Sequence, residues 1–352
     1  MRSTDVAVIG AGPIGVELAC AVKRAGVDYL HLEAKQVGAT LMWWAPGTRF
    51  FSSPERLALA GIPLVTADQA KATGEEYLAY LRQVVLAHDL PIQRYTRVEE
   101  ITRDGTEYEL ATRREGSPRI EPIRAKRLVL AIGNMHAPRL IGVPGETDRP
   151  DVSHYLADPH TYFGRRLLIV GGKNSAVEAA IRCWRAGAEV TMSYRAAAFD
   201  PDRIKYWLLP ELEWLISKGR IRFLPRTAPV AFEDGAALLA PLDDTGAPAG
   251  DPIRHECDFT LLLTGYVQDQ TLFDQLDLKR IGDERKPVVD PQTMETSSPG
   301  VYVAGTASGG SQRRARVFIE TSHVHVDRIV AALTGAPAPA AAADEHAALP
   351  ES

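Results

Sequence analysis

The sequence predicts an α/β protein built from two successive βαβ units. Two glycine-rich turns carry this prediction, because each follows an apolar run of β-type residues and opens a helical stretch rich in alanine. The first turn reads Gly-Ala-Gly-Pro-Ile-Gly over residues 10–15, and the second reads Gly-Gly-Lys-Asn-Ser-Ala over residues 171–176. With 352 residues, the chain has room for two domains with separate cores. We therefore expect two Rossmann-like dinucleotide-binding domains.

Each unit is expected to run strand, helix, strand. These elements span 6–9, 13–24 and 29–32 in the first unit, and 167–170, 175–185 and 189–193 in the second. An apolar strand that ends at glycine closes each unit, at 128–133 and at 261–265. Both closing turns are candidate crossings between the domains.

A strand at 299–305 and a helix from about 314 to 333 follow the second crossing, and we expect them to return to the first domain. The first domain is then discontinuous. The expected boundaries are 1–155 with 285–335 for the first domain, 156–284 for the second, and 336–352 for an Ala/Pro-rich tail that we expect to be disordered.

Composition excludes several classes of function. A formal charge of −5, without a long basic stretch, argues against a general binder of nucleic acid or anionic membranes. The sequence has no signal-like start and no run of 18 apolar residues, so we expect a soluble cytoplasmic protein. Cys20, Cys183 and Cys257 form neither a Cys-x-x-Cys pair nor a zinc-type cluster. Cys20 and Cys183 fall in predicted helices, where we expect them to pack as buried thiols.

The first turn has the features of a dinucleotide site. Gly10 permits the tight bend, Gly12 lets backbone amides approach a pyrophosphate, and Gly15 allows the helix to pack against its strand. Glu33 ends the following strand, where a carboxylate binds an adenosine ribose and repels a 2′-phosphate. This arrangement favours FAD or NAD over NADP.

The second turn differs from the first at the positions that are expected to select the ligand. Lys173 replaces the middle glycine, and Tyr194-Arg195 stands at the strand end where the first unit has its acid. An arginine there supplies a cationic fork to a 2′-phosphate, which favours NADPH over NADH. Arg203 and Lys205 follow, either as additional charge for the phosphate or as a solvated basic surface.

Three further segments are candidates with open alternatives. Residues 309–316 are expected to open the last helix with free amides that stabilise a reduced flavin, or to be a plain helix start. The aromatic segments at 42–44 and 49–55 either cover a cofactor or line a substrate pocket, or form a packed loop. His325 on the last helix is our candidate catalytic proton donor, and His323 lies beside it; the alternative is a structural role.

With these residues in hand, the chain resembles the family of bacillithiol disulfide reductases (YpdA type), relatives of the low-molecular-weight thioredoxin reductases. The resemblance covers residues 5–333. It rests on the motifs at residues 50–55 (Phe-Phe-Ser-Ser-Pro-Glu), 142–146, 170–175, 194–195, 208–211, 264–266, 293–296 and 318–320.

The resemblance implies a thioredoxin-reductase-like fold, FAD at the first turn, NADPH at the second turn, and a homo-oligomer, either dimer or tetramer. It also implies electron transfer without a redox Cys-x-x-Cys. Better-known members carry cysteine in the first turn where this chain has Ile14, and Thr306 follows Gly305 where related flavoproteins often have aspartate. The candidate cofactor-binding residues are Gly10, Gly12, Pro13, Ile14, Gly15, Glu33, Ala131, Gly133, Gly171, Gly172, Lys173, Asn174, Ser175, Ala176, Tyr194, Arg195, Thr264, Gly265, Gly305, Thr306, Arg314, Ala315 and Arg316.

We therefore expect an NADPH-dependent FAD oxidoreductase that passes electrons to an acceptor. The expected acceptor is a low-molecular-weight disulfide such as bacillithiol disulfide. A ferredoxin or flavodoxin reductase, with a small electron-carrier protein as partner, is the first alternative. A flavin monooxygenase and a non-catalytic NADPH-sensing flavoprotein are the others.

Overall fold

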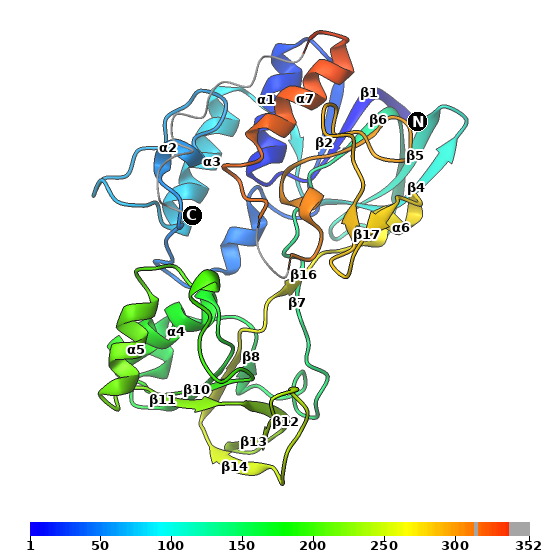
Figure 1. Cartoon of the computed structure of the whole chain (residues 1–352). Helices are drawn as coiled ribbons and strands as arrows, with labels where there is room; N and C mark the ends of the chain where they lie inside the picture. Colours follow the sequence, from blue (N-terminus) through cyan, green and yellow to red (C-terminus); the bar gives the residue numbers. More distant parts are fainter. Residues whose placement is uncertain (313–315, 338–352) are drawn as a thin grey trace. The chain divides into compact units, whose positions relative to one another are not determined.

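The computed structural model describes residues 1–312 and 316–337, which form two compact units (Figure 1). Of the described residues, the first unit contains 1–43, 47–137, 266–312 and 316–337, and the second contains 44–46 and 138–265. Two short paired strands, β7 (Ala137–Pro138) and β16 (Tyr266–Val267), carry the chain out of the first unit and back into it. The first unit is therefore discontinuous.

The first unit is built on a seven-stranded sheet with a parallel core. Its order is β3-β2-β1-β6-β5-β4, and β19 pairs in parallel with β6. The parallel order β3-β2-β1-β6-β19 is that of a Rossmann-like unit, and the antiparallel pairs of β4, β5 and β6 extend the sheet. The strands are β1 (Arg2–Ile9), β2 (Tyr29–Leu32), β3 (Ile92–Gln93), β4 (Thr96–Asp104), β5 (Glu107–Arg114), β6 (Ile120–Leu130) and β19 (Val301–Val303).

Helices and loops cover this sheet. The helices and short elements are α1 (Pro13–Arg24), α2 (Pro54–Leu57), α3 (Gly74–Ala87), α6 (Thr271–Gln275), α7 (His323–Thr334), η1 (Ala39–Trp43), η4 (Gly305–Gly309) and the β17–β18 pair (Arg280–Ile281 and Lys286–Pro287). Helix α1 begins with proline at its first position and ends with Lys23 and Arg24, as the helix dipole favours.

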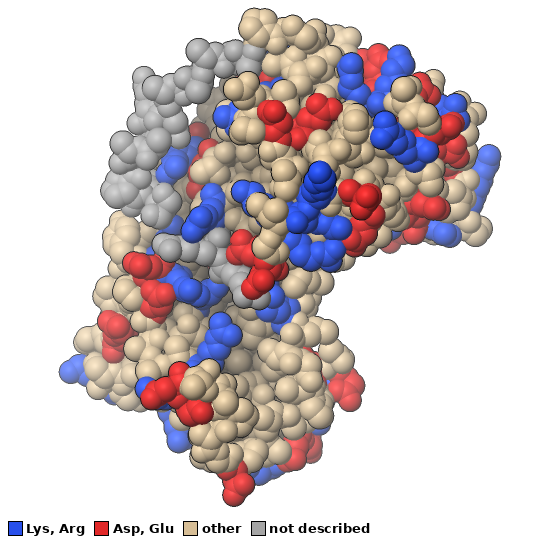
Figure 2. Space-filling model, turned by 45° about the vertical axis from the view of Figure 1, so that its right-hand side comes forward, with Lys and Arg blue, Asp and Glu red and all other residues tan. Residues whose placement is uncertain are grey.

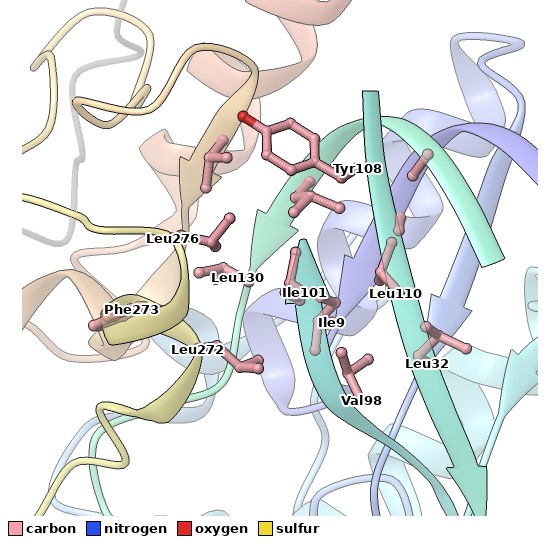
Figure 3. Packing of buried hydrophobic residues seen from close by; sticks show 14 of the residues in the cluster. Ile9, Leu32, Val98, Ile101, Tyr108, Leu110, Leu130, Leu272, Phe273 and Leu276 are labelled. Atoms are coloured by element: carbon pink, nitrogen blue, oxygen red, sulfur yellow. The ribbon is translucent and has the colours of Figure 1, made fainter. Parts of the chain in front are cut away.

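Buried apolar side chains fill both faces of the first sheet. On one face, Val6 and Val8 of β1 pack with residues of α1 and α7. On the other face, Ile9, Leu32 and Leu130 pack with β4, β5 and the fully buried Phe273 of α6 (Figure 3). This packing fixes the carboxyl ends of β1 and β2, where the first glycine turn begins.

The second unit repeats the parallel arrangement on a smaller scale. Its five-stranded sheet has the order β11-β10-β9-β15-β8, and a three-stranded antiparallel sheet, β12-β13-β14, is inserted in the chain between β11 and β15. The elements are β8 (Val152–Ser153), β9 (Arg166–Val170), β10 (Glu189–Tyr194), β11 (Arg222–Pro225), β12 (Thr227–Glu233), β13 (Ala236–Pro241), β14 (Ile253–Glu256), β15 (Phe259–Leu262), α4 (Asn174–Arg185), α5 (Leu209–Ser217), η2 (Pro159–Tyr162) and η3 (Pro201–Arg203).

The division between the units falls earlier in the chain than the expected boundaries at 155 and 285. Strand β8 pairs with β15 and so belongs to the second sheet. Helix α6 buries Leu272 and Phe273 in the first core, which places residues 266–284 in the first unit. The crossings lie just after the two apolar strands that we predicted as crossing points. Of the predicted tail, residues 338–352 lie outside the described part of the chain.

The surface shown in Figure 2 carries Lys and Arg side chains interspersed with Asp and Glu, in keeping with the modest net charge of −5. Every helix within residues 1–312 and 316–337 is too short or too polar to span a bilayer.

Candidate dinucleotide-binding sites

The three glycines of the first turn meet different demands. Gly10 has φ +104°, and a Cβ there would lie 2.4 Å from the carbonyl oxygen of Ala131. A Cβ on Gly15 would lie 2.0 Å from the carbonyl oxygen of Gly10. The packing of α1 against the strand ends therefore requires glycine at both positions. Gly12 is different, because its backbone is extended (φ −72°, ψ −178°) and a Cβ would meet nothing within 4 Å.

Gly12 is the N-cap of α1, where backbone amides face outward from the helix. Pro13 follows at the first helical position, where its missing N–H costs nothing. The first turn of α1 carries no acidic side chain that would repel a phosphate. Since the protein's own packing leaves the space at Gly12 open, the turn fits the approach of a pyrophosphate.

Glu33 lies directly beside this turn. Its Oε2 accepts a hydrogen bond from the amide of Ala11 at 2.6 Å, and its Oε1 accepts one from the amide of Lys35 at 2.8 Å. A carboxylate has about four acceptor sites, so it can also accept bonds from a ribose. The predicted acid is thus held in place by the backbone on both sides.

Two predicted segments converge on the first turn. Gly133 has φ +72°, and a Cβ on it would lie 3.9 Å from Oγ1 of Thr306. Gly305 has φ +68°, and a Cβ on it would lie 3.1 Å from Cβ of Ile14. The fold therefore brings the glycine turn, the end of β6 and η4 to one place, as the candidate site requires.

Gln268 holds these segments together, and no motif marks it in the sequence. Its side chain is buried, and Nε2 donates to the carbonyl oxygens of Gly133 at 3.0 Å and Ala307 at 2.8 Å. Its backbone amide donates to Oγ of Ser311 at 2.9 Å. A single glutamine after a two-residue strand gives no sequence signal, so only the structure reveals this role.

His325 is buried and fixed to the same region. Its Nδ1 accepts a hydrogen bond from the amide of Gly305 at 3.2 Å, so the ring proton is on Nε2. Burial is the main cause that lowers its pKa to about 4. A neutral ring engaged at Nδ1 favours a positioning role over the predicted proton donor.

The pKa of His323 is shifted in the opposite direction. Its Nδ1 lies 2.8 Å from Oε2 of Glu17 and its Nε2 lies 3.0 Å from the carbonyl oxygen of Arg56. Burial alone would lower its pKa, but the hydrogen bond to Glu17 and the charge of that carboxylate raise it overall. His323 therefore holds a proton more readily than His325 and joins α7 to α1 and α2.

The expected helix start at residues 309–316 is wrong. Helix α7 begins at His323, and described residues 316–322 are not helical. Oε1 of Gln312 accepts hydrogen bonds from the amides of Arg316 at 2.7 Å and Val317 at 2.9 Å, so these amides are not free. Arg316 is exposed on this loop, and the predicted residues Arg314 and Ala315 lie outside the described part of the chain.

The aromatic stretch at 49–55 is packed within the first unit. The buried Phe50 ring lies 4.7 Å from that of Tyr77, and Oγ of Ser52 donates to Glu320 at 2.6 Å. In the neighbouring segment, the rings of Trp43 and Tyr266 lie 4.9 Å apart. These contacts support the packed-loop interpretation for the residues that make them.

The second turn is shaped by an aromatic ring. Gly171 has φ +146°, and a Cβ there would lie 2.6 Å from the carbonyl oxygen of Leu263. A Cβ on Gly172 would lie 2.6 Å from ring atoms of Tyr194, so this ring covers one side of the turn. Lys173 is the N-cap of α4, and the first turn of that helix also carries no acid. The predicted Ser175 is exposed at the start of α4, while Ala176 is buried.

Basic residues gather beside this second turn. Arg195 is exposed immediately after β10. Oδ1 of Asn174 accepts a hydrogen bond from the amide of Lys205 at 2.8 Å, which ties the loop carrying Lys205 to the turn. Arg203, by contrast, is paired with Asp200 at 2.9 Å. Thus Arg195 is the better placed of the two arginines for a ligand phosphate.

Thr264 and Gly265 lie at the return crossing. Oγ1 of Thr264 donates to the carbonyl oxygen of Arg139 at 2.7 Å, and the amide of Arg139 donates to the carbonyl oxygen of Gly265 at 2.8 Å. Gly265 has φ +100°, which a side chain would strain. These predicted residues therefore shape the crossing itself.

All three cysteines are buried, as expected for Cys20 and Cys183. Burial raises the pKa of Cys20 to about 11 and that of Cys183 to about 12, and it also raises the pKa of Cys257. Thiolates are the reactive form of cysteine, so these groups are inert at neutral pH.

Comparison with known proteins agrees with this architecture. Residues 7–305 match the family model described as pyridine nucleotide-disulphide oxidoreductase. The bacilliredoxin reductase Bdr of Bacillus subtilis (strain 168) is 30% identical over 329 residues, which cover 92% of this chain and 95% of that protein. A ferredoxin–NADP reductase of Ignicoccus hospitalis is 29% identical over 318 residues, covering 88% of this chain and 92% of that protein. The structure of bacillithiol disulfide reductase Bdr (YpdA) from Bacillus cereus matches with a TM-score of 0.88 and 27% identity, covering 96% of this chain and all of that one (100%).

The match spans both glycine turns and both crossings, which confirms the predicted family and fold class. The chain belongs to the pyridine nucleotide-disulphide oxidoreductase family, as an FAD- and NAD(P)H-dependent oxidoreductase with two Rossmann-like domains.

Proposed function

We propose that the first unit binds FAD at the turn over residues 10–15 and that the second unit binds NADPH at the turn over residues 171–176. The chemistry that FAD supplies when bound is acceptance of a hydride from NADPH and onward transfer of two electrons. The observation that carries the FAD assignment is the open space at Gly12, beside the backbone-held carboxylate of Glu33. Gln268 and His325 fix the neighbouring loops at Gly133 and Gly305.

The choice of NADPH in the second unit rests on the end of β10. Glu33 directly follows β2 in the first unit, whereas Arg195 follows β10 in the second, and it is exposed. A guanidinium binds a 2′-phosphate through charge-assisted hydrogen bonds, while a carboxylate repels one. The backbone amide of Lys205 is bound to Asn174 at the start of α4, so the loop that carries this second basic residue is tied to the turn.

We further propose that the acceptor is a low-molecular-weight disulfide such as bacillithiol disulfide. The support is the similarity to the Bdr proteins of Bacillus subtilis and Bacillus cereus. Reduction breaks the S–S bond of the acceptor and consumes two electrons and two protons. The hydride of NADPH supplies both electrons and one proton equivalent, and the medium supplies the second proton.

The electrons reach this acceptor without a thiol relay from the protein. Each cysteine of the chain is buried, and burial raises each thiol pKa above its ordinary value. A thiolate is required for attack on a disulfide. The residues at the site therefore act by binding and orientation, and the cofactors carry the redox chemistry.

A ferredoxin or flavodoxin reductase is the second candidate. The similarity to the Ignicoccus hospitalis ferredoxin–NADP reductase favours it, and that reaction also needs no protein dithiol. The two candidates share the first half of the reaction and differ only in the acceptor.

The test begins with anaerobic mixing of the purified flavoprotein with NADPH or NADH, followed by absorbance at the flavin band. Rapid bleaching with NADPH is expected, and binding without bleaching would leave a nucleotide sensor instead. NADPH consumption is then compared at equal enzyme with bacillithiol disulfide, other small disulfides, ferredoxin and flavodoxin. Turnover with ferredoxin and with no disulfide would replace the first candidate by the second. The predicted homo-oligomer is checked by light scattering on the same sample.

A further inference from the structure

Strand β2 holds one peptide group of the first turn from both ends. Nε2 of His31 lies 2.9 Å from the carbonyl oxygen of Gly10, and the amide of Ala11 donates to Oε2 of Glu33 at 2.6 Å. His31 and Glu33 are two residues apart in an extended segment, so both side chains project from the same face of the sheet. The peptide bond between Gly10 and Ala11 thus has its carbonyl bound by one side chain and its amide bound by the other.

The donor in the first of these bonds is the imidazole. A carbonyl oxygen only accepts, so Nε2 of His31 carries the proton and Nδ1 is an acceptor. The ring is completely buried (0% exposed), and within the described residues Nδ1 has no hydrogen-bond partner. Burial lowers the pKa of His31 to about 4, so the ring is neutral near pH 7. The polar contact that the ring makes is therefore its bond to the glycine turn.

The direction of this carbonyl governs the rest of the turn. The carbonyl oxygen of Gly10 lies so close to α1 that a Cβ on Gly15 would be only 2.0 Å away. Because a peptide group is planar, fixing its carbonyl and its amide fixes the plane in which the chain passes from Gly10 to Ala11, the residue before Gly12. The amides that follow Gly12 at the start of α1 then face the open space where a pyrophosphate can bind.

We propose that His31 is a positioning residue for the FAD-binding turn, acting with Glu33 to clamp the Gly10–Ala11 peptide in its ligand-binding orientation. This inference rests on the proposed binding of FAD by the first unit. It also assigns Glu33 two tasks, one on the turn and one on the ribose. An aliphatic side chain at position 31 would fill the same buried space but would leave the Gly10 carbonyl without its donor.

The test uses His31→Leu, which removes the donor, and His31→Gln, whose amide nitrogen restores one. His31→Met repeats the first change with a more adaptable side chain, should His31→Leu fail to fold. His160→Gln is the matched control, because His160 is an exposed histidine of the second unit. FAD affinity is measured by flavin fluorescence on apoprotein, and NADPH affinity is measured in parallel. Amide hydrogen exchange at Ala11 and Gly12 is followed without cofactor.

We expect His31→Leu to weaken FAD binding by about tenfold or more, the effect of losing a buried hydrogen bond, with NADPH binding unchanged. His31→Gln should recover most of the affinity, and amide exchange at Ala11 should accelerate in His31→Leu and His31→Met but not in His31→Gln or His160→Gln. Unchanged FAD affinity and unchanged exchange in a folded His31→Leu or His31→Met protein would overturn the inference. If wild-type apoprotein takes up no FAD, the proposed function fails instead, and the exchange data still decide whether the clamp exists.

Discussion

Replacing Gly12 with alanine should weaken FAD binding while leaving the stability of the fold nearly unchanged. The backbone at this position is extended (φ −72°), and a Cβ would meet no atom within 4 Å. A Gly→Ala change stabilises by about 0.4–1 kcal/mol through the unfolded chain, while alanine is a poorer N-cap than glycine by a similar amount. These contributions nearly cancel, so the free energy of unfolding of the apoprotein should change by less than about 1 kcal/mol.

The same methyl group should weaken the binding of FAD. It would project into the space through which a phosphate approaches the amides at the start of α1. Losing two charge-assisted hydrogen bonds at about 1.5–3 kcal/mol each amounts to about 3 kcal/mol or more. Since about 1.4 kcal/mol corresponds to a factor of ten, the dissociation constant for FAD should rise at least about 100-fold.

The assay pairs urea denaturation of the apoprotein, followed by circular dichroism, with an FAD titration followed by flavin fluorescence. Gly15→Ala is the contrasting variant, because its Cβ would lie 2.0 Å from the carbonyl oxygen of Gly10 and must disturb the fold. If the Gly12→Ala protein binds FAD within threefold of the wild-type affinity, the reasoning is refuted, because the pyrophosphate then does not lie next to Gly12.

Three further predictions test the second unit, the electron route and the buried histidines. Arg195→Ala should lower kcat/KM for NADPH about tenfold, after allowance for solvent exposure, and should change kcat/KM for NADH little. The ion-paired Arg203 supplies the control variant Arg203→Ala. Equal losses of kcat/KM with both nucleotides would rule out binding of the 2′-phosphate by Arg195. Protein in which alanine replaces every cysteine should keep its rate with the disulfide acceptor in a stopped-flow assay, and loss of that rate with normal flavin reduction would reveal a thiol relay. His31 and His325 have folded pKa values of about 4 against an ordinary 6.5, so the unfolded chain binds protons first as the pH falls. As the pH falls from 6.5 to 4, each of these histidines should therefore lower the free energy of unfolding by up to about 3 kcal/mol. If the free energy of unfolding from urea denaturation depends on pH identically in wild type and in His31→Leu, this prediction is wrong.

Local patterns in the sequence predict the parts of the fold that short-range physics determines. The helix expected at 13–24 is α1 (Pro13–Arg24), and the strand expected at 29–32 is β2 (Tyr29–Leu32). Apolar periodicity, glycine turns and the terminal proline are all local signals, and tertiary contacts do not override them here. The same signals locate both glycine turns and the acid after β2.

Interactions between distant segments explain what the sequence does not reveal. The glycines and serine at 309–311 are typical of a helix start, but the side chain of Gln312 binds the amides of Arg316 and Val317, and α7 begins only at His323. A histidine within an apolar strand has the appearance of an ordinary core residue until the carbonyl of Gly10 is found beside it. The expected boundary at residue 284 lies too late in the chain, because Phe273 of α6 is buried in the first core and that burial has no local signature.

Ile14 bears on how electrons reach a disulfide, because the family that the chain resembles often has cysteine there. Ile14 is buried, and its Cβ lies 3.1 Å from where a Cβ on Gly305 would be. The start of a helix favours a thiolate by about 0.3–1 kcal/mol, which is less than one pKa unit. Burial raises the pKa of Cys20, on the same helix, from 9.0 to about 11. The cysteines that the chain does carry are all buried, and burial raises the pKa of each. With isoleucine at position 14, the first turn supplies no thiol, which agrees with the proposed direct delivery of electrons from the flavin to the acceptor.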